Sequence, residues 1–135
     1  MTRREQREQT FILIFEKIFH EDASFSELTE AAAFAQSHKP DAYALSAAEG
    51  VYSHLEELDA VISQNARGWK LERLSKIALS ILRLAIYEIK FCDDIPESVS
   101  INEAVELAKT YSTTEDASFI NGLLGTVARA AGEQS

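Results

Sequence analysis

The side chains best suited to chemistry in this 135-residue chain are its histidines, its single cysteine and its clustered arginines. His20, His38 and His54 lie in separate segments, and none has an acidic residue three positions before it. The Glu-x-x-His pattern of a carboxylate-bridged metal site in a helical bundle is therefore absent, and we expect no metal. Cys92 precedes two aspartates, whose charge disfavours a thiolate, so a nucleophilic cysteine is not expected.

Other catalytic signatures are missing as well. The chain has no glycine-rich phosphate loop and no Gly-x-Ser-x-Gly elbow, so we expect neither catalysis nor a cofactor. One cysteine cannot form an internal disulfide, which suits a reducing cytoplasm. The apolar run from Phe11 to Phe15 is too short for a signal peptide or a membrane span. These features indicate a cytoplasmic protein that is not an enzyme.

The arginines near the N-terminus are the most informative polar residues. On a helix, Arg3 and Arg7 lie one turn apart, and Arg4 lies near the line of Phe11 and Phe15. Arginines beside aromatic edges can hold phosphates and stack on the bases of a single strand. The alternative is an exposed N-terminal turn that binds nothing.

Phe119 is a second candidate, because it lies off the centre of the apolar stripe of its helix, where a ring is either half exposed or at the edge of the core.

The net charge of -9 argues against a nucleic-acid partner in general, since polyanion affinity depends on neutralising phosphates. The charge is uneven, however. Between Glu21 and Ala66 nine acids face the single base Lys39, whereas bases gather at the N-terminus and from Arg67 to Lys90. A small basic site on an acidic protein is compatible with this distribution.

The elements that must position these residues are predicted to be helices. Two prolines, five glycines and many helix-forming residues favour helices over sheets, and no strand of period two is evident. The apolar spacing predicts a helix over about Arg4 to His20. Ser24 or Ser26 can cap a short second helix, which carries Leu28 to Ala35 and ends near Pro40. The pattern further predicts a long helix from Asp41 to Gly68 that Gly50 could interrupt, a central one from Ile77 to Phe91, one opening at Ser100, and a last one carrying Ile120 to Val127.

The helix from Ile77 to Phe91 is apolar nearly all round, which is typical of a helix in the middle of a bundle. Arg83 lies inside it and requires an acidic or carbonyl partner if it is buried, with Glu103 and Glu106 as the first candidates. Ser100 and Glu103 have the Ser-x-x-Glu spacing of a capping box, which predicts a helix start at Ser100.

Four ordered blocks of this sequence resemble the NusB transcription antitermination family. They are Leu82–Glu88 (LRLAIYE), Asp94–Pro96 (DIP), Ile101–Lys109 (INEAVELAK) and Phe119–Leu124 (FINGLL). The arginine-rich opening and the segment Trp69–Leu74 (WKLERL) are similar to that family too. The resemblance covers nearly the whole chain and is weakest from Ala23 to Ala66.

This resemblance implies an all-α fold, a compact bundle of about seven helices in two small subdomains. It implies one RNA-binding domain over residues 1–135, with an N-terminal part of about 1–68 and a C-terminal part of about 69–131. Members are non-catalytic bacterial cytoplasmic factors. With the ribosomal protein NusE they hold the single-stranded boxA element of ribosomal RNA leaders and join elongating RNA polymerase.

Site residues follow from the same resemblance, position by position. The implied RNA contacts are Arg3, Arg4, Arg7, Phe15, Glu115, Ser118 and Phe119, with residues 115–118 expected as a loop near the bases. The implied partner contacts are Arg73, Lys76 and Ala78. The chain departs from the family pattern at Glu5, Gln6, Phe15 and Ala78, and Phe15 replaces a common tyrosine and so lacks one hydroxyl.

Two other functions are compatible with the sequence. One is an RNA-free protein-interaction module, such as a homodimer that covers the arginine surface. The other is an RNA-modifying enzyme, because NusB-like domains also precede RNA methyltransferase domains. The chain ends at Ser135 without room for a cofactor-binding fold, which disfavours this enzyme.

Overall fold

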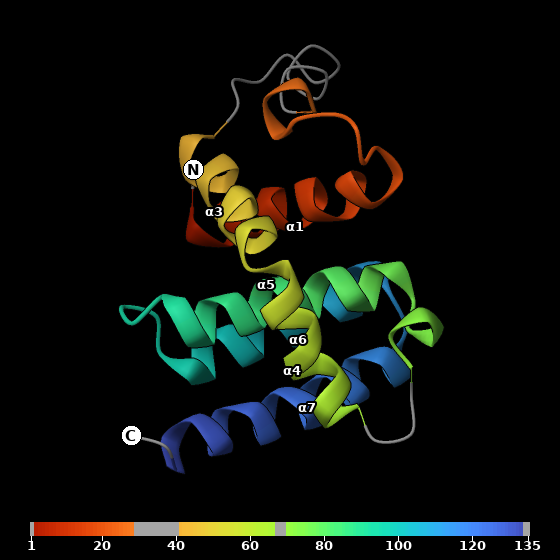
Figure 1. The fold of residues 1–135 in the computed structure, drawn as a ribbon. Coiled ribbons are helices and arrows are strands. Elements are labelled where there is room, and N and C mark those ends of the chain that lie inside the picture. The colour runs from red at the N-terminus through yellow and green to blue at the C-terminus, as the bar shows by residue number, and fades with distance from the viewer. Residues whose placement is uncertain (1, 29–40, 67–69, 134–135) are drawn as a thin grey trace. The chain divides into compact units, whose positions relative to one another are not determined.

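The computed structural model describes residues 2–28, 41–66 and 70–133 (Figure 1). Across these residues all regular structure is helical, and the predicted all-α class is confirmed. The helices are α1 (Arg3–Phe19), α3 (Ala42–Ser53), α4 (Leu55–Asn65), α5 (Lys76–Phe91), α6 (Glu97–Tyr111) and α7 (Thr114–Glu133), with a 3-10 turn η1 (Leu71–Arg73). Residues 25–28 are also helical and follow Ser24, one of the two predicted caps, whose hydroxyl accepts the N–H of Glu27 at 3.1 Å. The rest of the predicted short helix lies outside the described residues.

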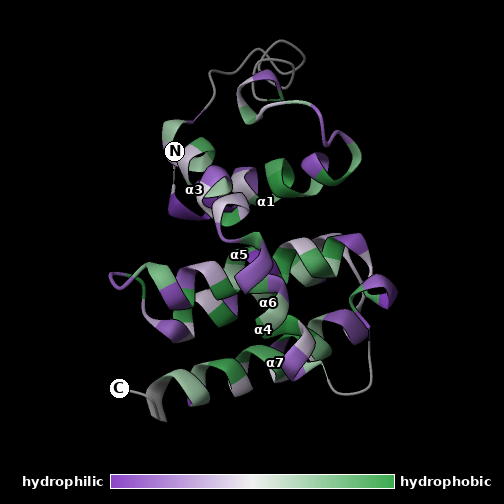
Figure 2. Cartoon of the chain, in the orientation of Figure 1, coloured by the Kyte–Doolittle hydropathy of each residue, from purple (hydrophilic) through white to green (hydrophobic). Residues whose placement is uncertain are grey.

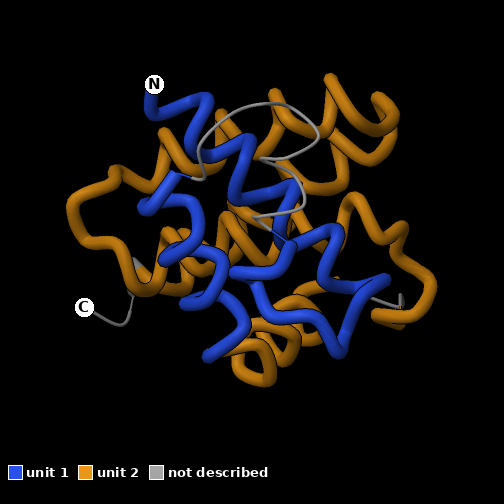
Figure 3. Tube along the Cα trace, turned by 90° about the horizontal axis from the view of Figure 1, so that it is seen from above, with its two compact units in different colours: residues 1–53 blue, residues 54–135 orange. Residues whose placement is uncertain are grey.

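The chain divides into two compact units, Met1–Ser53 and His54–Ser135 (Figure 3). The family resemblance predicts a division near residue 68, after α4. In the structure α4 packs on α5 and α7 and is therefore part of the second unit. Hydrophobic and hydrophilic residues share the helices of each unit, as amphipathic packing requires (Figure 2).

The first unit is built on the packing of α1 against α3. Phe11 and Ile14 of α1 are buried with Ala48 and Val51 of α3. Tyr52 adds a polar contact, because its hydroxyl donates to the carbonyl of Ile14 at 3.3 Å. The aromatic stripe predicted for the first helix is therefore confirmed in its buried part.

The second unit is organised around α5, which packs on α4, α6 and α7. Every residue from Ser80 to Ile86 is buried, as expected of a helix that is apolar nearly all round. The helix begins one residue before the predicted start, because the hydroxyl of Ser75 accepts the N–H of Ala78 at 3.0 Å and caps its first turn. It ends at Phe91, as predicted, ahead of the acidic turn before Pro96.

The long helix predicted from Asp41 is two helices, and this prediction was wrong in its continuity. The interruption falls at His54, with φ -116° and ψ 19°, and not at Gly50, which lies inside α3. The ring of His54 stacks on that of Phe91 from α5 with centroids 4.2 Å apart. This contact between distant segments is not visible in the local sequence. The stop predicted at Gly68 lies outside the described residues.

The partner of Arg83 is Asp59 of α4, and neither Glu103 nor Glu106. Nε of Arg83 donates to Oδ1 of Asp59 and an Nη donates to Oδ2, both at 2.9 Å, which is the bidentate arrangement that guanidinium and carboxylate favour. Arg83 is 8% exposed, so this pair binds α4 to α5 within the second unit.

The predicted capping box at Ser100 is also wrong. Helix α6 begins at Glu97, directly after Pro96, whose fixed φ suits a helix start. Ser100 therefore lies in the second turn and is buried, and its hydroxyl donates to Oε1 of Glu88 at 2.8 Å. Glu88 is 5% exposed, and a buried carboxylate requires hydrogen-bond donors.

Candidate nucleic-acid interface

The arginines of α1 stand on a fully capped helix start. The hydroxyl of Thr2 accepts the N–H of Glu5 at 3.1 Å, and the Glu5 carboxylate accepts from the backbone N–H and the hydroxyl of Thr2, which completes a capping box. Glu5, one of the departures from the family pattern, thus has a local structural role. Arg3 and Arg4 are exposed and Arg7 is half-buried. The turn presents its guanidinium groups from an ordered helix end.

Phe15 lies in a row of aromatic rings along α1. Its ring centroid is 6.3 Å from that of Phe11 and 5.1 Å from that of Phe19, the second contact being edge-to-face. Exposure rises along the row, from 3% at Phe11 through a half-buried Phe15 to 55% at Phe19. Phe15 is therefore accessible in part and is supported by rings on both sides.

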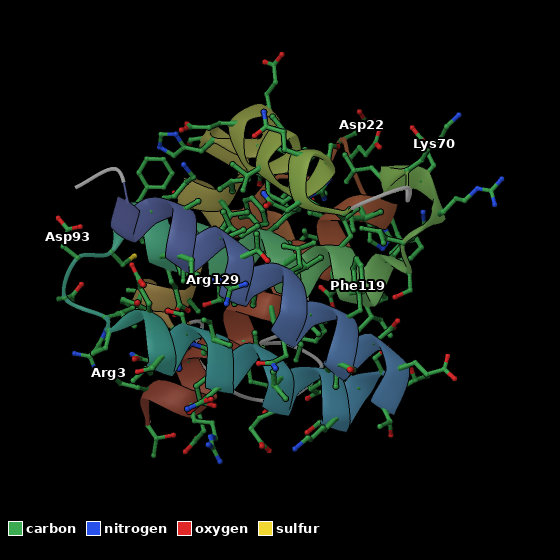
Figure 4. All side chains as sticks on the ribbon, turned by 90° about the horizontal axis from the view of Figure 1, so that it is seen from below. Arg3, Asp22, Lys70, Asp93, Phe119 and Arg129 are labelled. Carbon is green, nitrogen blue, oxygen red and sulfur yellow. The ribbon has the colours of Figure 1, made fainter. Side chains whose placement is uncertain are left out.

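The segment 115–118 is the first turn of α7, and the prediction of a loop there was wrong. The hydroxyl of Thr113 accepts the N–H of Asp116 at 3.0 Å and caps the helix. Glu115 and Ser118 are exposed and Phe119 is half-buried. Because these positions are three and four residues apart on a helix, they share one face. Figure 4 shows Phe119 on this helix.

Asp116 connects this turn to the start of α5, and sequence reasoning missed it. Its Oδ2 accepts the hydroxyl of Ser75, 41 residues earlier, at 3.2 Å. The hydroxyl of Ser112 donates to the same oxygen. No periodic or motif signal in the sequence relates Ser75 to Asp116, because the pairing depends on how α5 and α7 pack.

The three predicted partner contacts lie at the beginning of α5. Arg73 in η1 and Lys76, the first residue of α5, are exposed. Ala78 is 1% exposed, so its methyl group packs inside the unit and the exposed charges of this predicted surface are Arg73 and Lys76. Lys70 precedes α5 and Asp93 follows it, and the two lie at opposite sides of the view in Figure 4. Basic residues lie before and at the start of α5, and two aspartates, Asp93 and Asp94, follow its end.

The predicted RNA contacts divide between the two units. Arg3, Arg4, Arg7 and Phe15 belong to the first unit, and Glu115, Ser118 and Phe119 belong to the second. Each unit thus offers one helix start: basic in the first, and acidic, polar and aromatic in the second.

Groups suited to other chemistry are few in the described part of the chain. Within residues 2–28, 41–66 and 70–133, no group of three or more His, Cys, Asp or Glu side chains could hold a metal ion. None of the helices described there is both long and apolar enough to cross a membrane. Burial raises the pKa of the Tyr87 phenol, and Cys92 adds to the rise, so this phenol is protonated at neutral pH.

Comparison with known proteins identifies the class. A model of the NusB family matches residues 4–129. The chain is 43% identical over 131 residues to the transcription antitermination protein NusB of Agathobacter rectalis, covering 95% of this chain and 100% of that protein. It is 45% identical over 130 residues to the protein of that name from Acetivibrio thermocellus, covering 96% and 90%. These relatives are transcription antitermination proteins and not enzymes.

Solved structures agree with that class. The structure of NusB from T. maritima is similar with a TM-score of 0.84 at 34% identity, covering 96% of this chain and 92% of that one. The chain belongs to the NusB family. A crystal structure of antitermination factors NusB and NusE in complex with dsRNA shares the fold, with a TM-score of 0.81 at 23% identity over 96% of this chain and 99% of that one.

Proposed function

We propose that this chain is a transcription antitermination factor that binds single-stranded boxA-type RNA of ribosomal RNA leaders together with the ribosomal protein NusE. The observation that carries the proposal is the capped start of α1, which presents Arg3, Arg4 and Arg7 on an otherwise acidic protein. Family membership supports the antitermination role, since the matched relatives are named for it. The factor acts in the bacterial cytoplasm on the elongating RNA polymerase.

In this proposal the arginines at the start of α1 bind the RNA phosphates, and residues at the start of α7 contact the bases. Guanidinium groups of Arg3, Arg4 and Arg7 bind phosphate oxygens, for which their planar donors are suited. The half-buried rings of Phe15 and Phe119 stack on bases, an interaction worth about 1–3 kcal/mol per base. A carboxylate repels phosphate, so Glu115 accepts from base amino groups or a 2′-hydroxyl instead, and Ser118 can donate or accept.

NusE is proposed to bind at the beginning of α5 through the exposed side chains of Arg73 and Lys76. Ala78 is buried beside them and supports this turn from inside the unit. Support comes from a protein of the same fold whose crystal structure contains NusE and RNA. The exposed positive charge there gives a partner with acidic groups a complementary surface.

The proposal is tested by titrating labelled boxA RNA at several salt concentrations, with and without NusE. If three arginines each neutralise one phosphate, log affinity falls with log salt at a slope of roughly -2. Changing Arg3, Arg4 and Arg7 together to Ala should remove most of this slope and most of the affinity. The matched control changes Lys90, Lys109 and Arg129 to Ala, because it removes as many positive charges from exposed positions that have no assigned RNA contact.

A salt-independent affinity, or equal losses in the two triple variants, would contradict the proposal. Size-exclusion mass with and without the RNA adds a second criterion. A dimer that the RNA never dissociates, combined with no loss in the arginine variant, would favour the RNA-free homodimeric module.

A further inference from the structure

One hydroxyl group, that of Ser75, joins the starts of α5 and α7 in the second unit. The oxygen of Ser75 accepts the N–H of Ala78 at 3.0 Å, and its proton is directed to Oδ2 of Asp116 at 3.2 Å. Ser75 precedes α5 and Asp116 lies in the first turn of α7. The same group therefore caps one helix and bonds the opening turn of the other.

The carboxylate at the far side of this contact is itself held in place. Oδ2 of Asp116 also accepts the hydroxyl of Ser112, and the backbone N–H of Asp116 donates to Thr113 at 3.0 Å. A hydroxyl has one proton, so donation to the carboxylate leaves its lone pairs for Ala78. Hydrogen bonds that share one group in this way strengthen each other. A displacement of the α7 turn thus weakens the cap of α5, and the reverse also holds.

The two turns that this contact joins carry residues with different proposed partners. The α7 turn bears Glu115 and Ser118, with Phe119 one position further on, and the α5 start bears Lys76 with Arg73 just before it. We propose that Asp116 is a positioning residue that couples RNA binding at the start of α7 to partner binding at the start of α5 through the hydroxyl of Ser75. The inference rests on the proposed function, which assigns RNA to one turn and NusE to the other.

The physical basis is a shared ordering step. Whichever ligand binds first fixes the Ser75–Asp116 contact, so the second ligand binds a turn that is already positioned. The coupling is reciprocal: RNA raises the affinity for NusE by the factor by which NusE raises the affinity for RNA. If the contact only held α5 against α7, removing it would lower the stability and both separate affinities. The factor by which each ligand raises the affinity for the other would then be unchanged.

The experiment measures the coupling factor, defined as the Kd for labelled boxA RNA without NusE divided by the Kd with saturating NusE. Two substitutions of Ser75 form a matched pair. Asp and Asn are both good N-cap residues, so Ser75→Asp and Ser75→Asn keep the α5 cap. They differ toward Asp116, since an asparagine amide can donate to the carboxylate and an aspartate repels it.

In wild type we expect a coupling factor of roughly 10, within the usual range for coupled sites. Ser75→Asn should keep most of it, and Ser75→Asp should reduce it to below about 2, with the Kd for RNA alone changing less than about 3-fold. Thermal unfolding and far-UV circular dichroism establish that both variants are folded. Equal coupling factors in the two variants would overturn the inference.

Substitutions at Asp116 give an independent measurement. Asp116→Ala removes the acceptor and should abolish the coupling, whereas Asp116→Asn keeps an oxygen for both serine hydroxyls and should rescue it in large part. Wild-type coupling in the Ala variant, or no rescue in the Asn variant, would count against a positioning role. If wild type bound no boxA RNA, the proposed function would fail and this inference with it. If wild type bound RNA and NusE with a coupling factor near 1, the inference alone would fail.

Discussion

The two compact units hold their polar groups in different ways. Four of the five polar or charged residues that are buried in the described chain lie in the second unit; the set is Thr10, Ser80, Arg83, Glu88 and Ser100. Thr10 in the first unit bonds to a carbonyl four residues earlier in its own helix. In the second unit Arg83 and Glu88 bond to side chains of other helices at 2.8–2.9 Å. Two long-range side-chain hydrogen bonds among the described residues of the first unit are longer, at 3.3 and 3.4 Å.

This difference shows what specifies each unit. In the first, α1 and α3 pack through aromatic and aliphatic side chains, and the polar start of α1 is capped by Thr2 and Glu5. In the second, charge-assisted bonds connect α4 to α5 and α5 to α6, and a carboxylate bonds the starts of α5 and α7. Buried polar bonds tolerate little displacement, so the Arg83–Asp59 and Ser100–Glu88 bonds hold α4, α5 and α6 in one arrangement.

The largest effect is expected from breaking the Arg83–Asp59 pair. Arg83→Met leaves the Asp59 carboxylate without its guanidinium partner and should lower the free energy of unfolding by about 3 kcal/mol. The double variant Arg83→Met, Asp59→Leu removes both charges and should recover most of that loss. Urea unfolding followed by circular dichroism measures both. A double variant as unstable as the single one would show that the loss came from packing and not from the unpaired charge.

A smaller effect is expected at the contact between α5 and α6. Ser100→Ala removes a donor from the buried carboxylate of Glu88 and should cost about 1–2 kcal/mol. Ser98→Ala, at an exposed position of the same helix, is the matched control and should change stability by less than about 0.5 kcal/mol. The urea midpoints of the two variants make the comparison. Equal midpoints would mean that Glu88 does not depend on the Ser100 hydroxyl.

The smallest effect is expected in the first unit. Tyr52→Phe removes one 3.3 Å hydrogen bond to the carbonyl of Ile14 and keeps the ring that packs on Phe25, so it should cost about 0.5 kcal/mol. Thermal unfolding of this variant beside Ser100→Ala tests the comparison directly. If Tyr52→Phe were the more destabilising of the two, polar contacts would specify the first unit as strongly as the second.

The sequence predicted the helical elements wherever a single stripe of residues defined them. Helix α5 was expected from Ile77 to Phe91 and spans Lys76–Phe91, because its apolar residues bury themselves whatever their partners are. The break at His54, the start of α6 at Glu97 and the Asp59 partner of Arg83 were not predicted. Each of them depends on a contact or packing arrangement between helices, which periodicity does not encode.

In the candidate site too, local features could be predicted from the sequence and long-range contacts could not. The arginines of α1 could be singled out, because three like charges in five residues stand out in any acidic chain. Their Thr2–Glu5 capping box is local, so its Thr-x-x-Glu spacing can be read from the sequence. Asp116 could not be found in this way, since its significance comes from Ser75, which is distant in sequence. The loop expected at residues 115–118 follows from the resemblance alone, and the five polar residues before Ala117 give no apolar stripe that would indicate a helix there.

The shared hydroxyl of Ser75 also has a consequence for sequence variation among relatives. A carboxylate at position 116 bonds to position 75 only if the residue there offers a proton, and an acidic residue at position 75 would leave two carboxylates facing each other. Substitutions at the two positions should therefore occur in compensating pairs. A relative that lacks a donor at the first position is expected to have a small or uncharged residue at the second.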